Sequence, residues 1–309
     1  MKNAKSIILS LICSLAFAVS SCQEQQRESP TQGNLTIISS EDVFPVIDLQ
    51  VKDFSRVYEK ATITHLSSSA RDAIVQLLND SVKLIVCPRE LNDEEKRVII
   101  QNELNVTTTK IAYDAVAVIV NQKNTLEKMT VDELKNIVTG KVQRWTEVEG
   151  SGLSSAIIIA MGDPNSAVFE YLKTRLFGNE KLATTVLPCS STREVFDVVS
   201  ERPNAIGFVG ISWLSDAPKN IRVLSVGDPK YQRDSTSTVL EYFPPHQAHI
   251  YRNYYPLSRT IYIYTHKAGQ GVALGFSSFA AGVEGQKIIV KNGLVPATMP
   301  VRLVQLNQQ

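Results

Sequence analysis

The chain has 309 residues, of which 43% are hydrophobic and 20% are charged, a composition typical of a globular protein large enough for two lobes. Lys and Arg number 32 and Asp and Glu number 31, so the charge balance gives no sign of a nucleic-acid-binding protein. Neither CxxC nor HxxxH spacing occurs, and we therefore expect no zinc site and no cofactor.

The N-terminal segment has the features of an export signal. Lys2 and Lys5 precede an apolar stretch, residues 7–19, that is too short to span a bilayer comfortably. The sequence VSSC that ends at Cys22 resembles a bacterial lipobox, which implies cleavage of residues 1–21 and lipidation of the Cys22 thiol. The alternative is an ordinary secretory signal followed by a chance cysteine.

The segment that follows, residues 22–33, is polar and lacks core-forming residues, so we expect a flexible tether. After lipidation of Cys22, the remaining thiols are Cys87 and Cys189, too few for a disulfide framework. We expect the protein to lie in the cell envelope, held by its lipid on the periplasmic side of a bacterial membrane.

Short apolar strands alternate with amphipathic helices in the first third of the chain. The helix after Ser40 carries apolar residues at helical spacing from Ile47 to Tyr58, and Asn92 with Glu95 forms a capping box for a later helix. This alternation predicts a largely parallel sheet. The predicted strands are Leu35–Ser39, Thr62–Leu66 and Lys83–Cys87.

One long apolar stretch, Lys110–Asn121, has the pattern of a strand buried on both faces. Similar sets of strands and helices precede and follow it. We interpret it as the crossover strand between two α/β lobes, with Tyr113 and Asp114 near the cleft, where ligands often bind. The alternative is an ordinary central strand of one large sheet, with Asp114 at its exposed end.

The second half of the chain repeats the alternation. Thr130 and Glu133 form another capping box, and Gly140 is a good residue to end that helix. Residues Tyr231–Leu257 are irregular and form either a functional loop or a wrapping segment. The predicted strands are Ala156–Met161, Thr184–Leu187, Ala205–Val209, Ile221–Val226 and Ser258–His266, and the closing helices are Val272–Ala281 and Glu284–Lys291.

Four loops place Ser, Thr or Asn at predicted helix N-termini. Such ends offer free N–H donors and the positive end of the helix dipole, which are the ingredients of an anion site. The alternative for any one loop is that its hydroxyl only caps its own helix. The loops are Ser39-Ser40, Ser67-Ser68-Ser69, Asn165-Ser166 and Ser190-Ser191-Thr192.

Two stretches resemble a known family, and a third, shorter match supports them. Thr130–Trp145, TVDELKNIVTGKVQRW, is similar to the L-x-x-x-x-L-x-x-I-F-x-G-K-x-x-x-W segment of PstS-type phosphate-binding proteins of bacterial ABC importers. Pro203–Gly210, PNAIGFVG, is similar to their G-A-I-G-Y-V strand, and Tyr255-Pro256-Leu257 matches their Y-P-[IL] before a late strand. The G-K-x-x-x-W part is the most specific, and the order of elements fits over nearly the whole mature chain.

The resemblance implies an α/β protein with the two-lobed type-II periplasmic-binding fold, whose mixed, mostly parallel sheets are joined by crossover strands. Lobe one would comprise residues 34–107 and 233–309, and lobe two residues 108–232. The resemblance also implies a monomer that holds phosphate or a similar oxyanion between its lobes and delivers it to an ABC permease. Together with the helix ends, it favours the first three serine-rich loops as the ligand site and leaves the fourth open.

The sequence departs from the family at two charged positions. After the third strand the family carries a Ser-Asp pair, whose Asp accepts a hydrogen bond from protonated phosphate, but this chain has Pro88-Arg89. The lobe-two loop R-S-D-G-S-G-T becomes Met161–Ala167, which has no Arg. One consistent account is that Arg89, with Arg71, supplies the positive charge from lobe one. The alternatives are a surface pair between Arg89 and Glu90 and a solvent-facing Arg71.

Three functions remain for comparison. The first is a lipid-anchored binding protein for an oxyanion, and the second is a PstS-like sensor or accessory lipoprotein for a different small ligand or partner. An enzyme is disfavoured because no G-x-S-x-G elbow or similar motif sets a nucleophile beside a base. Glu41 and Asp42 are a complication for the first, since carboxylates in the first turn after Ser40 repel a bound anion unless they point outward.

Overall fold

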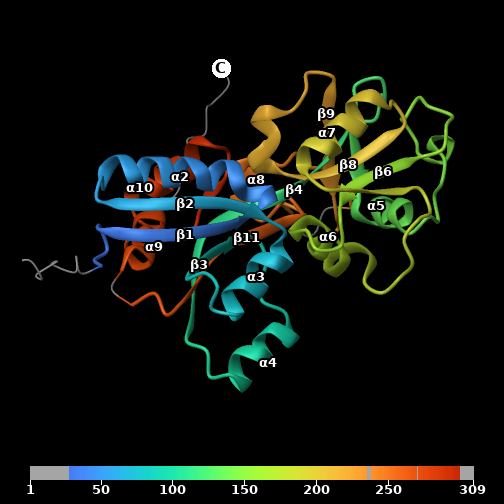
Figure 1. Ribbon diagram of the computed structural model, residues 1–309. Helices are drawn as coiled ribbons and strands as arrows, with labels where there is room; N and C mark the ends of the chain where they lie inside the picture. The colour runs from blue at the N-terminus through green and yellow to red at the C-terminus, as the bar shows by residue number, and fades with distance from the viewer. Residues whose placement is uncertain (1–27, 235–237, 270, 300–309) are drawn as a thin grey trace, which may run out of the picture.

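The computed structural model of the protein describes residues 28–234, 238–269 and 271–299 (Figure 1). The predicted export signal and Cys22 lie outside these residues. Gly33, the last residue of the predicted tether, already belongs to the first strand. No helix in the described part of the chain is long and apolar enough to cross a membrane.

Strands and helices alternate along the chain, as the sequence periodicity predicts. The strands are β1 (Gly33–Ser40), β2 (Ala61–Ser68), β3 (Leu84–Cys87), β4 (Val106–Asn121), β5 (Lys128–Thr130), β6 (Ile158–Gly162), β7 (Val186–Cys189), β8 (Ala205–Gly210), β9 (Ile221–Val223), β10 (Ser225–Gly227), β11 (Ser258–His266) and β12 (Val295–Pro296). The α-helices are α2 (Phe44–Val57), α3 (Ala70–Leu78), α4 (Asp93–Gln101), α5 (Val131–Val138), α6 (Ala167–Leu172), α7 (Thr192–Glu201), α8 (Gln247–Tyr251), α9 (Val272–Ala281) and α10 (Val283–Lys291). Short helical turns are η1 (Glu41–Val43), η2 (Trp145–Glu147), η3 (Lys173–Phe177) and η4 (Ile211–Asp216).

Lobe one is built on β1, β2 and β3, which pair in parallel, with β11 antiparallel beside β3. Helices α2, α9 and α10 pack over one face of this sheet, and α3 packs over the other (Figure 1). Ile47 and Phe54, which the periodicity places on the apolar side of α2, are fully buried. Burial of these side chains between sheet and helix is the main force that holds α2 in place.

Strand β4 connects the two lobes. Its first half pairs antiparallel with β11, from Val106 opposite His266 to Ala115 opposite Ser258. Its second half, from Val116 onward, pairs antiparallel with β8 and β9. The expected crossover strand is therefore present, although it starts at Val106 rather than Lys110, and Asp114 lies where the pairing passes from one lobe to the other.

Lobe two is built on the parallel strands β6, β7 and β8, with α7 packed against β6 and β8. Trp145 of the family-like segment is fully buried, and its Nε1–H donates to the carbonyl oxygen of Asn204 at 2.8 Å. Gly140 has a φ of 74° just beyond α5, which confirms it as the residue that ends this helix. The two-lobed periplasmic-binding fold predicted from the sequence is confirmed.

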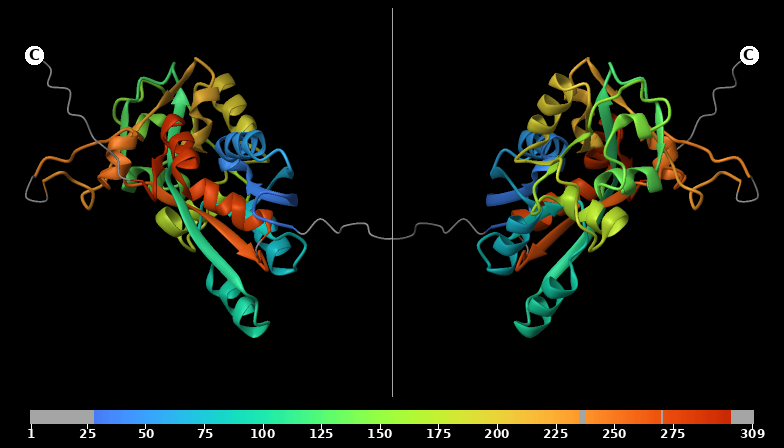
Figure 2. Two further views of the ribbon diagram at one scale, coloured as in Figure 1. Left: turned by 90° about the vertical axis from the view of Figure 1, so that its left-hand side faces the viewer. Right: turned by 90° about the vertical axis from the view of Figure 1, so that its right-hand side faces the viewer.

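Several local features differ from the sequence predictions. The predicted strand Ile221–Val226 is two short strands, because β9 pairs with β4 whereas β10 pairs with β5. Ser40 precedes the short turn η1 rather than α2 directly, and α8 lies within the segment predicted to be irregular. Helix α4 contains no buried residue and projects from the body near the start of β4 (Figure 2).

Candidate functional site

The carboxyl ends of four strands, two from each lobe, meet at one cavity. Ser40 and Ser68 end β1 and β2 side by side, and Gly162 and Cys189 end β6 and β7 side by side. The cavity between them has a volume of about 230 Å³, smaller than the sites that hold drug-sized ligands. It is lined by Ser40, Glu41, Asp42, Ser67, Ser68, Ser69, Gly162, Asp163, Ser166, Val168, Cys189, Ser190, Ser191, Thr192, Val195 and Phe208.

Helices α3, α6 and α7 begin at this cavity. The capping hydroxyls of Ser69, Ser166 and Ser191 each accept a first-turn backbone N–H, at 3.1, 3.1 and 3.2 Å. The same residues therefore cap helices and line the cavity. The helix-capping and anion-site interpretations of these loops do not exclude each other. Three helix N-termini direct the positive ends of their dipoles at one small volume, an arrangement that favours a bound anion.

Behind the cavity wall lies a buried cluster of one guanidinium and two carboxylates. The Ser40 hydroxyl donates to Asp42 at 2.5 Å, and Asp42 is paired with Arg259 at 2.7 Å. Arg259 also contacts Asp114 at 2.6 Å, with the Asp114 side chain fully buried. Burial raises the pKa of Asp114, and the Arg259 charge opposes that rise. The cluster connects β11, the crossover strand and the turn η1, which carries Asp42.

Glu41 crosses the cavity from lobe one to lobe two. Its carboxylate accepts hydrogen bonds from the backbone N–H of Thr192 at 3.0 Å and from the Thr192 hydroxyl at 2.8 Å. Burial raises the pKa of Glu41, although both hydrogen bonds act to lower it. The carboxylate thus sits at the N-terminus of α7, where two donors of the other lobe point into the cavity.

The charged groups of the cavity lining are acidic. Across the described ranges, the lining holds Glu41, Asp42 and Asp163 but no Lys, Arg or His. Arg259 stands behind Asp42, and the charge of Arg193 acts on Glu41. An anion in this cavity therefore depends mainly on hydroxyl and backbone donors to offset its loss of hydration.

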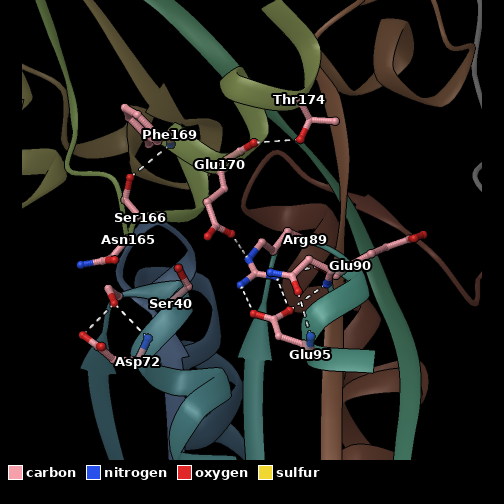
Figure 3. A network of polar contacts seen from close by, with 12 residues as sticks. Ser40, Asp72, Arg89, Glu90, Glu95, Asn165, Ser166, Phe169, Glu170 and Thr174 are labelled. Atoms are coloured by element: carbon pink, nitrogen blue, oxygen red, sulfur yellow. Dashed lines mark hydrogen bonds and ion pairs between the residues drawn. The ribbon is translucent and has the colours of Figure 1, made fainter. Parts of the chain in front are cut away.

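Arg89 lies outside the cavity lining and joins the two lobes beside it (Figure 3). Its guanidinium binds Glu95 through two hydrogen bonds of 2.7 and 2.9 Å, and its Nε contacts Glu170 of α6 in lobe two. It also donates to the backbone carbonyl of Glu90 at 2.8 Å. The side chain is only 9% exposed. Its side-chain partners in this structure are carboxylates, and any effect on a ligand passes through the lobe interface.

Arg71 and Asn165 meet through their backbones rather than at the cavity. The Arg71 N–H donates to the Asn165 carbonyl oxygen at 3.2 Å, which ties the start of α3 to the loop before α6. Neither residue belongs to the lining, and the Arg71 side chain is exposed. Both predicted site residues therefore lie at the rim, where the lobes touch.

Ser39 and Tyr113 also lie outside the lining. Tyr113 is 39% exposed in a shallow cavity with Tyr251, away from the serine-rich loops. The hydroxyl of Ser39 is 2.8 Å from Nε2 of His65, whose Nδ1 is 3.3 Å from Asp48. This order of Ser, His and carboxylate is that of a catalytic triad, but Ser39 is 0% exposed and cannot reach a solute. The three residues instead fix the end of β1.

The sequence analysis did not select several lining residues. Gly162, Asp163 and Cys189 are brought to the cavity by the ends of β6 and β7. Gly162 and Asp163 lie in the loop that aligns with the family's lobe-two loop, but the sequence analysis did not single them out. Thr192 belongs to the fourth serine-rich loop, whose role the pattern left open and which does line the cavity. The useful signal was their position just after predicted strands, since the carboxyl ends of parallel strands gather at one edge.

We expect Gly162→Ala to weaken both the cap of α6 and ligand binding. An alanine Cβ at this position would lie 2.3 Å from the Ser166 hydroxyl oxygen, so the capping side chain must move. Loss of a serine N-cap costs about 0.5–2 kcal/mol of folding stability. Thermal unfolding and phosphate calorimetry measure the two effects. Ser166→Ala is the matched control, since it removes the cap without adding volume; equal ligand affinity in wild type and Gly162→Ala would contradict the placement of the site.

A family model described as a PBP superfamily domain matches residues 24–284 of the chain. The phosphate-binding protein PstS of Pseudomonas aeruginosa is 20% identical over 297 residues, which cover 91% of this chain and 88% of that protein. PstS of Borreliella burgdorferi is 23% identical over 302 residues, which cover 96% of this chain and 99% of that protein.

The fold is also found among solved structures. A putative phosphate ABC transporter substrate-binding protein from Clostridium perfringens, with bound phosphate, matches with a TM-score of 0.73 and 20% identity over 86% of this chain and 100% of that one. At this identity the structural match shows a shared fold. Since the family model spans most of the chain, the protein belongs to the PBP superfamily domain family.

Proposed function

We propose that the protein captures phosphate or a related oxyanion between its lobes and delivers it to an ABC permease. The observation that carries this proposal is the cavity where three helix N-termini and eight Ser or Thr residues from both lobes converge. Hydroxyl groups and first-turn N–H groups are donors suited to an oxyanion. The names of the relatives support the same ligand class, and those relatives are binding proteins rather than enzymes.

The proposed lobes follow the division expected from the sequence, residues 34–107 with 233–309 and residues 108–232. Ligands of small size need to be surrounded, and a site shared between two lobes achieves this when the lobes close. The contact between Arg89 and Glu170 lies across this division, which supports a closed arrangement as the ligand-holding state.

A second candidate is a PstS-like sensor or accessory protein for a different small ligand or partner. The acidic lining favours it, since Glu41, Asp42 and Asp163 surround a cavity with no lining cation in the described part of the chain. A ligand with hydroxyl or amide donors would suit these carboxylates better than a fully ionised oxyanion does.

A thermal-shift screen of the soluble chain from residue 23 onward separates the two candidates. Phosphate, sulfate, molybdate and neutral or amide-bearing solutes are compared at equal concentration, because a ligand that binds only the folded state raises Tm by mass action. We expect phosphate to raise Tm the most. A rise with a neutral solute and none with any oxyanion would replace the first function by the second.

We further propose that Cys22 carries a lipid anchor, and we expect Cys22→Ser to release the protein from membranes. The support is the lipobox-like VSSC followed by a polar tether. Fractionation of cells that express wild type or mutant measures the shift from the membrane to the soluble fraction. Unchanged membrane association of the mutant would contradict the lipid anchor and favour the alternative, an ordinary secretory signal.

A further inference from the structure

Glu41 makes a contact that a ligand of the cavity would be expected to make. The side chain comes from lobe one, and both of its carboxylate oxygens accept hydrogen bonds from Thr192 of lobe two. A carboxylate and one edge of a tetrahedral oxyanion present the same pair of acceptor oxygens to a backbone N–H and a hydroxyl. The protein therefore already places a negative group on the donors that lobe two offers at the start of α7.

The turn that carries Glu41 is fixed against lobe two by further contacts. The indole N–H of Trp213 donates to the backbone carbonyl oxygen of Glu41 at 3.0 Å. The Ser212 hydroxyl donates to the backbone carbonyl oxygen of Asp42 at 2.8 Å. Both donors belong to η4, which directly follows β8. The position of the Glu41 carboxylate is thus set by the backbone of η1 as well as by its own hydrogen bonds, and it needs no ligand to be held there.

We infer that the Glu41 carboxylate is a built-in occupant of the anion position, which holds the lobes together when no ligand is bound and must leave Thr192 when an oxyanion enters. The competition with an oxyanion rests on the proposed function, whereas the bridge between the lobes does not. In this arrangement Glu41 sets the affinity of the site, because part of the binding energy of a ligand is used to displace it.

The charges around Glu41 make this occupancy dependent on pH. Asp42 on the same turn and Asp163 in the cavity lining are acidic, as is Glu194 in the first turn of α7, and Arg193 of α7 is the cation that acts on Glu41. Burial raises the pKa of Glu41 above its ordinary value of 4.5. As the pH falls through that raised pKa, the carboxyl group becomes neutral, its hold on Thr192 weakens and its repulsion of an anion disappears.

The first test is phosphate calorimetry with wild type and Glu41→Gln, each measured from neutral pH downward. We expect Glu41→Gln to bind phosphate about tenfold more tightly at neutral pH, the effect of removing one charge-assisted contact. The ratio of the two dissociation constants should approach one as the pH falls through the pKa of Glu41. Because both proteins meet the same phosphate at each pH, titration of the ligand cancels in the ratio. Weaker binding by Glu41→Gln at neutral pH would overturn the competition.

The second test needs no ligand. Small-angle scattering of the phosphate-free chain should give a larger radius of gyration for Glu41→Ala than for wild type. Glu194→Gln is the matched control: its carboxylate also accepts an N–H at the start of α7, from Ser190 at 2.7 Å, but both residues lie in lobe two. An unchanged radius for Glu41→Ala would overturn the bridge. If wild type binds no phosphate but Glu41→Ala opens, the proposed function fails while the bridge stands.

Discussion

Arg259→Met is expected to lower the free energy of unfolding by about 3–5 kcal/mol, the usual result of removing one partner of a buried ion pair. The Arg259 side chain is 2% exposed, and its partners Asp42 and Asp114 are 5% and 0% exposed. Without the guanidinium, two carboxylates remain close together with no cation between them. Chemical unfolding measures the loss. Arg233→Met is the control, because Arg233 forms an exposed pair with Glu241 and its removal should change little.

The same variant has a defined dependence on pH. Burial already raises the pKa of Asp114, and removing Arg259 raises it further, since the Arg259 charge was the main influence that lowered it. A carboxyl group whose pKa is higher in the folded state than in the unfolded state stabilises the fold fully at pH values below its unfolded-state pKa. That contribution is lost as the pH rises through its folded-state pKa. The loss in free energy of unfolding caused by Arg259→Met should therefore be smallest near pH 3.8, the ordinary pKa of Asp, and should grow toward neutral pH. A deficit that is constant with pH would contradict the buried cluster.

Arg89→Ala is expected to weaken phosphate binding by about 1.5–3 kcal/mol, or roughly tenfold to a hundredfold in Kd. The reason is the lobe interface: Arg89 binds Glu95 within lobe one and Glu170 across it, and only the second contact depends on closure. Burial raises the pKa of Glu170, and Arg89 lowers it, so the mutation leaves a carboxylate poorly compensated in the closed state. Isothermal titration calorimetry with phosphate measures the change.

Arg71→Ala is the matched control for this prediction. Arg71 contacts lobe two through its backbone N–H, which alanine retains, so its effect on phosphate affinity should be smaller. A double-mutant cycle with Glu170→Ala isolates the contact between the lobes. Equal phosphate affinity of wild type and Arg89→Ala, or no coupling between positions 89 and 170, would show that this pair does not govern closure.

The sequence predicted the fold well where local pattern and tertiary structure agree. The apolar run from Lys110 to Asn121 predicted the crossover strand because a strand buried on both faces has no polar alternation to obscure it. The capping boxes at Asn92 and Thr130 were found because their two residues lie three positions apart and interact locally. For the same reason the hydroxyl residues at the helix starts were identified, and most of them line the cavity.

The charged partners were not predictable in the same way. Asp114 was singled out, but its partner Arg259 is 145 positions away, and no local pattern connects them. The contact of Glu41 with Thr192 spans 151 positions and depends on how the lobes meet. Arg89 was expected to face an anion, but its partner Glu170 comes from the other lobe. Side-chain direction at a lobe interface is set by tertiary structure, which strand and helix periodicity do not encode.

The most direct measurement of the central claim is calorimetric titration of phosphate into the soluble chain, with small-angle scattering of the same samples. We expect phosphate to bind with a stoichiometry of one per chain, since the cavity between the lobes is a single small volume. Sulfate and molybdate titrations under the same conditions define the selectivity. Saturable binding with a compact scattering profile is the predicted result. The absence of heat and of any Tm change with phosphate would contradict an oxyanion-binding function for this cavity.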